Sequence, residues 1–209
     1  MQQTTNVNIS DKTSNPAPLG LAGFGLTTIL LNLHNVGLFP LDSMIMSMGL
    51  FYGGIAQIIV GIMEWKKDNT FGTAAFTSYG FFWISLIFIW VLPKFGLAEA
   101  PTAQAMGCYL AVWAMFSFFL FLATFTMYRA LQVVFALLFV LFTLLSVANF
   151  TGSILIRSIA GIVGISCGLS ALYAGMGQVL NQYYNKSIMP LGLLTAKVIE
   201  VEKTADISL

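Results

Sequence analysis

Long stretches without a charged residue are the feature that most limits how this 209-residue chain can fold. Between residues 13 and 185 only nine charged side chains occur, and they leave six uncharged stretches. The stretches are residues 13–41, 43–63, 69–93, 100–128, 130–156 and 158–185. Each exceeds the roughly 20 residues that a helix needs to cross about 30 Å of hydrocarbon. We therefore expect an all-α integral membrane protein with six transmembrane helices.

Composition excludes the main classes of soluble protein. Charged residues make up 8% of the chain, whereas a soluble domain is about 25% charged. A net charge of +1 provides no basic surface for nucleic acid. The chain has no hydrolase, phosphate-loop or metal-ligand motif, so we expect no enzymatic activity, no cofactor and no metal site. Cys108 and Cys167 fall inside predicted helices and are expected to be small buried apolar residues.

Lysine and arginine are unevenly distributed over the predicted connections. With the N-terminus in the cytoplasm, seven of the nine basic residues lie inside, and only Lys94 and Arg157 lie outside. The positive-inside rule favours this arrangement, so both termini are predicted to be cytoplasmic. We expect a mobile polar tail at residues 1–14, a six-helix transmembrane domain at residues 15–192 and a charged tail at residues 193–209. Asp42 and Glu64 bracket the second stretch, where water is expected to reach them.

The first uncharged stretch holds an unusual number of polar side chains, which are costly to bury in hydrocarbon. On a helical wheel, Phe24, Thr28, Asn32 and Asn35 fall on one stripe about 80° wide. In the second stretch, Gln57 lies on a face that also carries glycines. We interpret Thr28, Asn32, Asn35 and Gln57 as polar residues that line a pore, with hydrogen bonding between helices as the alternative.

Other conspicuous residues in the stretches favour structural roles. His34 lies off the polar stripe, and a lone helical histidine is more often a hydrogen-bonded part of the scaffold than a proton relay. Glycines recur at helical spacing and predict close packing of helix backbones. These glycines are Gly49, Gly53, Gly164, Gly168 and Gly175.

A motif at the start of the first stretch combines an asparagine with two prolines and reads NPAPLGL. Asparagine can cap a helix, and proline is well tolerated in a first turn. The backbone amides that follow would point to the mouth of the pathway, where they favour a carboxylate. We therefore expect this NPAPLGL motif to bind substrate. Its residues are Asn15, Pro16, Ala17, Pro18, Leu19, Gly20 and Leu21.

The longer string NPAPLGLAGFGLTTILLNLHN resembles the signature of the acetate uptake transporter family, in particular of its bacterial succinate–acetate permeases. The resemblance continues through FYGGIAQI, KKDNTFGTAAFTSYGFFW and YAGMGQVLN. It implies a carrier or channel of the plasma membrane that assembles as a hexamer with one pore per subunit. It also implies an apolar constriction made of Phe24, Tyr79 and Leu138. Gln178 is a departure, because close relatives have an acid there, which puts a charge role in doubt.

We therefore expect transport of acetate and succinate through a narrow constriction that carries no fixed charge. The sequence leaves proton-coupled and channel-like mechanisms open. The expected partners are acetate, succinate, protons and the lipid bilayer, and the expected assembly is a homohexamer in the prokaryotic cytoplasmic membrane. A channel for a neutral small molecule such as ammonia or water is the alternative. A membrane subunit without a pore is the third possibility.

Overall fold

The computed structural model describes residues 13–192, so most of the two predicted tails lies outside the described residues. The described part is helical throughout its spans. In chain order its helices are α1 (Ala17–Asn35), α2 (Ser43–Met48), the π-helix η1 (Gly49–Ala56), α3 (Gln57–Lys66), α4 (Thr70–Val91), the 3₁₀-helix η2 (Leu92–Phe95), α5 (Ala103–Ala123), the 3₁₀-helix η3 (Thr124–Thr126), α6 (Arg129–Thr151) and α7 (Ile154–Tyr183).

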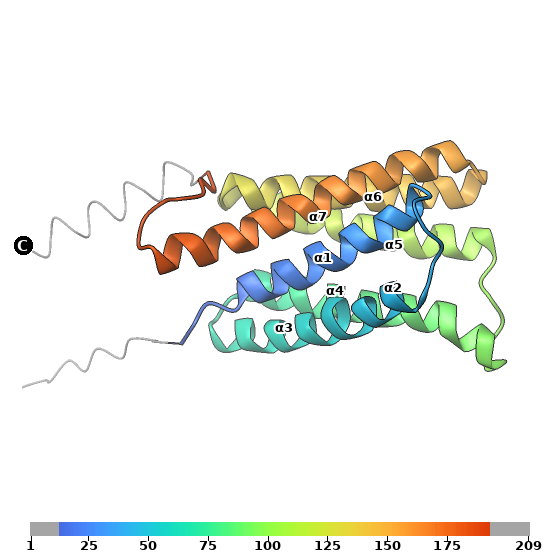
Figure 1. The fold of residues 1–209 in the computed structure, drawn as a ribbon, viewed down its shortest axis with the longest axis horizontal. Coiled ribbons are helices and arrows are strands. Elements are labelled where there is room, and N and C mark those ends of the chain that lie inside the picture. Colours follow the sequence, from blue (N-terminus) through green and yellow to red (C-terminus); the bar gives the residue numbers. More distant parts are fainter. Residues whose placement is uncertain (1–12, 193–209) are drawn as a thin grey trace, which may run out of the picture.

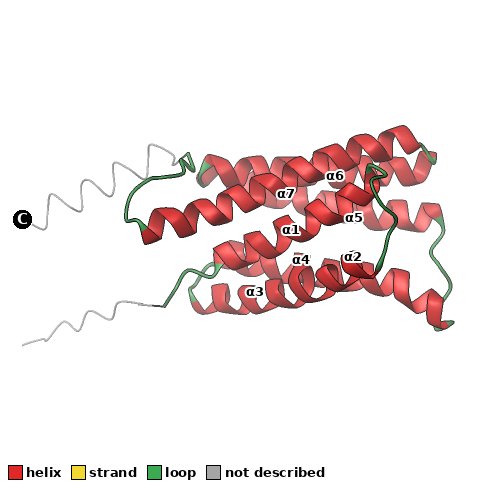
Figure 2. Cartoon of the chain, viewed as in Figure 1, coloured by secondary structure: helices red, strands yellow, loops and turns green. Residues whose placement is uncertain are grey.

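Several of these helices join end to end into longer rods. The segments α2, η1 and α3 form one rod, α4 continues into η2, and α5 continues into η3. Among the described residues, six helices are thus long and apolar enough to cross a membrane, which confirms the predicted six spans. The rods lie side by side (Figure 1), and short loops connect most of them (Figure 2). We call the end of the bundle at which the described chain begins and finishes the terminal end, and the opposite one the far end.

Glycines allow α1 and α7 to approach each other closely. A Cβ atom on Gly168 would lie 2.6 Å from the carbonyl oxygen of Gly25, and one on Gly25 would lie 2.7 Å from the carbonyl oxygen of Gly168. Farther along the same contact, Gly164 lies against Asn32 and Gly175 lies near the backbone of Pro18. The close packing predicted for the glycines of this span is therefore confirmed.

Alanine at Gly168 is expected to lower the free energy of unfolding by about 1–3 kcal/mol, because its methyl group would force the two helix backbones apart. The melting temperature of the detergent-purified protein measures this effect. Leu169→Ala is the matched control, because the neighbouring leucine is on the outer surface with 53% of its area exposed. Equal melting temperatures for the two variants would contradict the proposed tight crossing.

The second span contains eight consecutive residues with π-helical hydrogen bonding, which the sequence pattern did not predict. Such segments are rare and frequently occur at functional sites. Here Gly49 and Gly53 leave room for the indole ring of Trp83 on α4, whose atoms lie 2.9–3.2 Å from where a Cβ would be. The first residue after the π-helix is Gln57, whose amide donates a hydrogen bond of 2.6 Å to the Gly53 carbonyl.

The two cysteines differ in position. Cys167 is fully buried, and its thiol lies 3.5 Å from the carbonyl oxygen of Val134. Cys108 is exposed, so the prediction that both are buried is wrong for this residue. The reason is that α5 packs on one side only. Cys108 shares its outer side with Val112 and Met115, both more than half exposed.

Candidate functional site

A cavity of about 450 Å³ opens at the terminal end of the bundle. We call it the terminal cavity. Five polar residues from separate parts of the chain surround its mouth: Asn15, Asn69, Thr126, Tyr128 and Gln178. Its deeper walls are mainly apolar, with Gln57 as a polar exception. The apolar wall residues include Leu21, Phe24, Ala75, Tyr79, Val134, Phe135 and Leu138.

Hydrogen bonds join three of the mouth residues. The Asn15 amide donates to Gln178 Oε1 at 2.8 Å, and Gln178 Nε2 donates to the Tyr128 hydroxyl oxygen at 2.8 Å. Burial raises the pKa of Tyr128, and the negative charge of the nearby Glu64 raises it further. Tyr128 therefore stays neutral at physiological pH. Gln178 acts here as donor and acceptor at once, whereas an ionised acid at this position would accept hydrogen bonds only.

A buried carboxyl group lies behind this mouth. Glu64 is only 2% exposed, and its Oε2 accepts a hydrogen bond of 2.7 Å from the Asn69 amide. Its Oε1 is buried without a hydrogen-bond partner among the described residues. The expectation that water reaches Glu64 is therefore wrong, because Gly72 at the start of α4 lets the carboxyl group pack beneath that helix. Sequence reasoning missed this residue because its place near the end of a span suggests exposure.

A second cavity, of about 510 Å³, opens at the far end, and we call it the far cavity. His34 and Asn35 reach it from the last turn of α1. Lys94 and Arg157 reach it from η2 and α7. Within the described residues, no acidic side chain lines this cavity. The formally charged side chains that line this cavity are therefore both positive, and they attract an anion that enters it.

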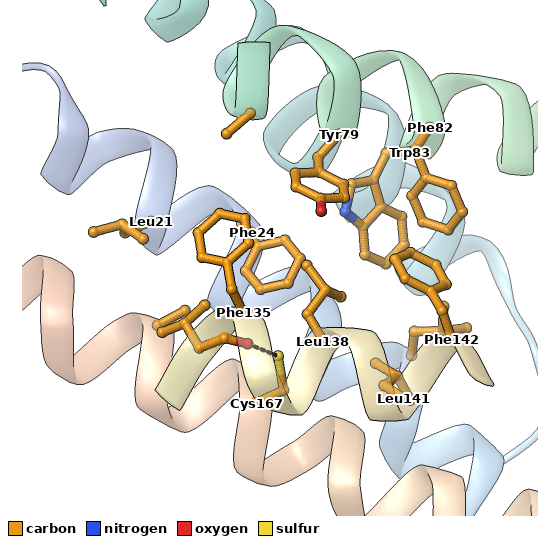
Figure 3. Close-up of a cluster of buried hydrophobic side chains, with 14 of the residues drawn as sticks. Leu21, Phe24, Tyr79, Phe82, Trp83, Phe135, Leu138, Leu141, Phe142 and Cys167 are labelled. Atoms are coloured by element: carbon orange, nitrogen blue, oxygen red, sulfur yellow. Dashed lines mark hydrogen bonds between the residues drawn. The ribbon is translucent and has the colours of Figure 1, made fainter. Parts of the chain in front are cut away.

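A cluster of aromatic rings separates the two cavities, which have no lining residue in common. Tyr79 closes the inner end of the terminal cavity, and Phe82 lies at the inner end of the far cavity. Phe142 contacts both, with ring centroids 6.5 Å from Tyr79 and 5.0 Å from Phe82. Figure 3 shows Phe24, Tyr79 and Leu138 gathered in this region from α1, α4 and α6. We call Phe24, Tyr79, Phe82, Leu138 and Phe142 the ring cluster.

The two cavities lie along the same faces of three helices. Cavity-lining residues recur at helical spacing on each helix. Those nearer the terminal end line the terminal cavity, those nearer the far end line the far cavity, and the ring cluster lies where the two sets meet. They are Ala17, Leu21, Phe24, Leu31 and Asn35 on α1, Phe71, Ala75, Tyr79, Phe82, Leu86 and Ile89 on α4, and Leu131, Val134, Leu138, Leu145 and Asn149 on α6. The arrangement is a line through the whole bundle that the ring cluster interrupts.

The structure divides the polar stripe that the helical wheel placed on one face. Phe24 lines the terminal cavity and Asn35 lines the far cavity, whereas Thr28 and Asn32 are buried and line neither; Gln57, predicted separately in the second span, lines the terminal cavity. The Asn32 amide donates to the Thr28 carbonyl at 2.9 Å, and its Oδ1 accepts from Asn35 at 2.9 Å. Asn32 is turned toward Gly164 of α7, where a methyl group would collide with its amide. The stripe is therefore not one lumen-facing row, because one edge of it packs on α7.

The predicted constriction residues do meet. Phe24, Tyr79 and Leu138 all line the terminal cavity and are all buried. The ring centroids of Phe24 and Tyr79 are 6.0 Å apart. The Tyr79 hydroxyl is hydrogen-bonded to Ser117 at 2.9 Å. The ring cluster therefore offers a solute no charged group.

The NPAPLGL motif does not present the free backbone amides that the expected anion site requires. The first-turn amides already have protein acceptors: Ala17 N donates to Asn15 Oδ1, and the amides of Leu19 and Gly20 donate to the Pro16 carbonyl. Pro16 and Pro18 have no N–H to offer. The backbone is therefore not free to bind a carboxylate. The Asn15 side chain and Ala17 line the terminal cavity, together with Leu21.

Three comparisons with known proteins agree. Residues 1–194 match the profile of the GPR1/FUN34/yaaH family. The Escherichia coli K12 protein named succinate-acetate/proton symporter SatP is 55% identical over 181 residues, which are 87% of this chain and 96% of that protein. The solved structure of the bacterial acetate channel SatP covers 87% of this chain and 100% of its own, with 55% identity and a TM-score of 0.86.

A more distant relative has a different printed name. The ammonia transport outward protein 2 of Saccharomyces cerevisiae is 38% identical over 183 residues, which are 82% of this chain and 64% of that protein. The six spans, the cavities at both ends and the close relatives all indicate a multi-pass membrane protein. The resemblance seen in the sequence is confirmed, and the chain belongs to the GPR1/FUN34/yaaH family.

Proposed function

We propose that the protein transports small carboxylates, chiefly acetate and also succinate, along the line through its two cavities. The observation that carries this proposal is the alignment of the terminal and far cavities on the same faces of α1, α4 and α6, with the ring cluster between them. A subunit that served only for packing would need no such path. The names of the close bacterial relatives support acetate as the substrate.

The chemistry of the path suits a small acid. The mouth of the terminal cavity offers amide and hydroxyl groups, which replace part of the hydration of a carboxyl group. The ring cluster has no charge and therefore selects mainly by size. Gln57 lies on the wall of the terminal cavity and is a further polar contact for the solute. We propose that Thr28 and Asn32 hold this path in shape and that Asn35 lines it at the far cavity.

We further propose that both termini are cytoplasmic and that the protein is in the prokaryotic cytoplasmic membrane. Lys66 and Arg129 are located where helices meet the terminal end, while Lys94 and Arg157 are at the far end, so the far end faces outward by the positive-inside rule. Both cavities and the ring cluster are formed within a single chain, which supports one pore per subunit. The family resemblance supports a homohexamer and no enzymatic role.

Uptake of radiolabelled acetate into proteoliposomes tests the proposal. Vesicles that contain the protein are expected to take up acetate faster than empty vesicles, and an inward proton gradient is expected to accelerate uptake if protons accompany the acid. Succinate in excess should compete with acetate. Uptake no faster than in empty vesicles would contradict the proposal. Labelled methylammonium in the same vesicles tests the alternative of an ammonia channel.

A further inference from the structure

The ring orientation of His34 is fixed by the turn that follows α1. His34 Nδ1 lies 2.9 Å from the carbonyl oxygen of Phe39. A carbonyl oxygen only accepts hydrogen bonds, so Nδ1 carries a hydrogen whether the imidazole is neutral or protonated. Nε2 is therefore the nitrogen that is left available to a solute. In the described part of the chain, Nε2 has no hydrogen-bond partner, and the residue lines the far cavity.

The groups around the far cavity favour an anion. Lys94 from η2 and Arg157 from α7 line it, and the polar residues Thr102 and Asn149 contribute no charge. The acids on neighbouring segments do not line it. Asp42 caps α2, where its carboxylate accepts from two backbone amides at 3.1 and 3.2 Å, and Glu99 is exposed in the loop before α5. A carboxylate in this cavity is thus attracted by two cations, and the imidazole of His34 lines the same cavity.

The ring cluster that the solute must cross next cannot stabilise this charge. Its side chains are apolar apart from the Tyr79 hydroxyl, which is hydrogen-bonded to Ser117. Moving an ionised carboxylate from water into such surroundings is far more costly than moving the neutral acid. The neutral form of the solute therefore crosses more easily, and it must be formed on the cavity side of the ring cluster.

We propose that His34 gives a proton to a carboxylate held in the far cavity, so that the solute crosses the ring cluster as the neutral acid. The Nε2–H bond of the imidazolium breaks, its electron pair stays on Nε2, and an O–H bond forms on the carboxylate. A hydronium ion from the solution at the far mouth then returns a proton to Nε2 and leaves a water molecule. This inference rests on the proposed function and names the residue that couples proton to solute.

A consequence of this arrangement is that anion and proton bind together. A carboxylate in the far cavity, which His34 lines, favours the protonated imidazole, because opposite charges attract. By linkage, the protonated imidazole favours the bound carboxylate to the same extent. Loss of the proton from His34 to the solute removes this attraction, and the neutral acid is free to move inward.

Magnetic resonance can follow the proposed step directly, because His34 is the single histidine of the chain. In the full-length protein with ¹⁵N-labelled histidine, Nδ1 is expected to stay protonated while Nε2 titrates. Saturating acetate is expected to move this titration to higher pH. A titration that acetate leaves unchanged, or one in which Nδ1 loses its proton first, would overturn the inference. Chloride at equal concentration is the control for salt.

A transport measurement provides the second test. His34→Asn keeps an amide N–H for the Phe39 carbonyl but removes the titrating nitrogen. Its acetate uptake is expected to fall about tenfold or more and to lose its rise between about pH 8 and pH 5. A variant with the wild-type pH profile would overturn the inference. If wild-type protein fails to take up acetate, the proposed function itself is wrong, and this outcome is distinct from a failure of His34.

Discussion

Leu138→Ala is expected to raise lactate uptake relative to acetate uptake by roughly tenfold, because one small change in an apolar pocket shifts discrimination by about that factor. Leu138 is 2% exposed, lines the terminal cavity and belongs to the ring cluster. Alanine there removes three carbons from the ring cluster. Because one side of the residue borders a cavity, the free energy of unfolding is expected to fall by about 2 kcal/mol, the low end of the range for such changes.

Two measurements on one preparation distinguish the possible roles of Leu138. The lactate-to-acetate uptake ratio reports on the path, and the melting temperature reports on packing. Leu141→Ala is a matched control, because Leu141 is buried on the same helix and lines neither cavity. It should lose stability without a change in the ratio. A large loss of stability in Leu138→Ala with an unchanged ratio would place this leucine in the core alone.

Tyr79→Ala is expected to have the largest effect on both stability and selectivity. The Tyr79 ring packs against Phe24, Trp113, Phe116, Phe135 and Phe142, with centroids 5.6–6.5 Å away. Its removal should lower the free energy of unfolding by about 3–5 kcal/mol. It should also join the two cavities, so that vesicles with the variant leak small neutral solutes such as glycerol, which the wild-type ring cluster retains.

Tyr79→Phe separates the ring from its hydroxyl. The phenylalanine ring keeps the ring cluster closed, and only the hydrogen bond to Ser117 is lost. Ser117 still donates to the Trp113 carbonyl at 2.8 Å, so the expected loss is about 0.5–1.5 kcal/mol without a leak. The glycerol leak and the melting temperature check both variants. Leakage in Tyr79→Phe, or its absence in Tyr79→Ala, would contradict a barrier made of rings.

The six spans could be predicted from the sequence because the membrane imposes a length on each uncharged stretch. The NPAPLGL motif was predicted from helix-capping chemistry and the constriction from a family resemblance, and the structure brings Phe24, Tyr79 and Leu138 together. The helical wheel placed Phe24 and Asn35 on one stripe of α1, and they line the terminal and the far cavity respectively. It could not tell which neighbour lies on the other edge of the stripe, so Asn32 was predicted in the path although it packs on Gly164.

Other features depend on contacts that no local pattern contains. The burial of Glu64 requires Gly72 to be placed above it and Asn69 to reach back to it, which are consequences of the turn between α3 and α4. The π-helical segment arises where glycines of the second span meet Trp83 of the third. The proposed role of His34 depends on the Phe39 carbonyl, which fixes the tautomer, and on a cavity shared with Arg157.

The thinness of the barrier between the cavities has an electrical consequence. Between the two cavities, the nearest lining residues are three apart on α4 (Tyr79 and Phe82) and seven apart on α1 and α6, so the barrier spans about 4.5–10.5 Å along the helix axes. When water fills both cavities, the membrane voltage falls almost entirely across this layer. An anion would meet the whole field in one step, at about 2.3 kcal/mol for each 100 mV. A neutral acid crosses the same layer without electrical work, so its flux follows the concentration and pH differences and is insensitive to the voltage.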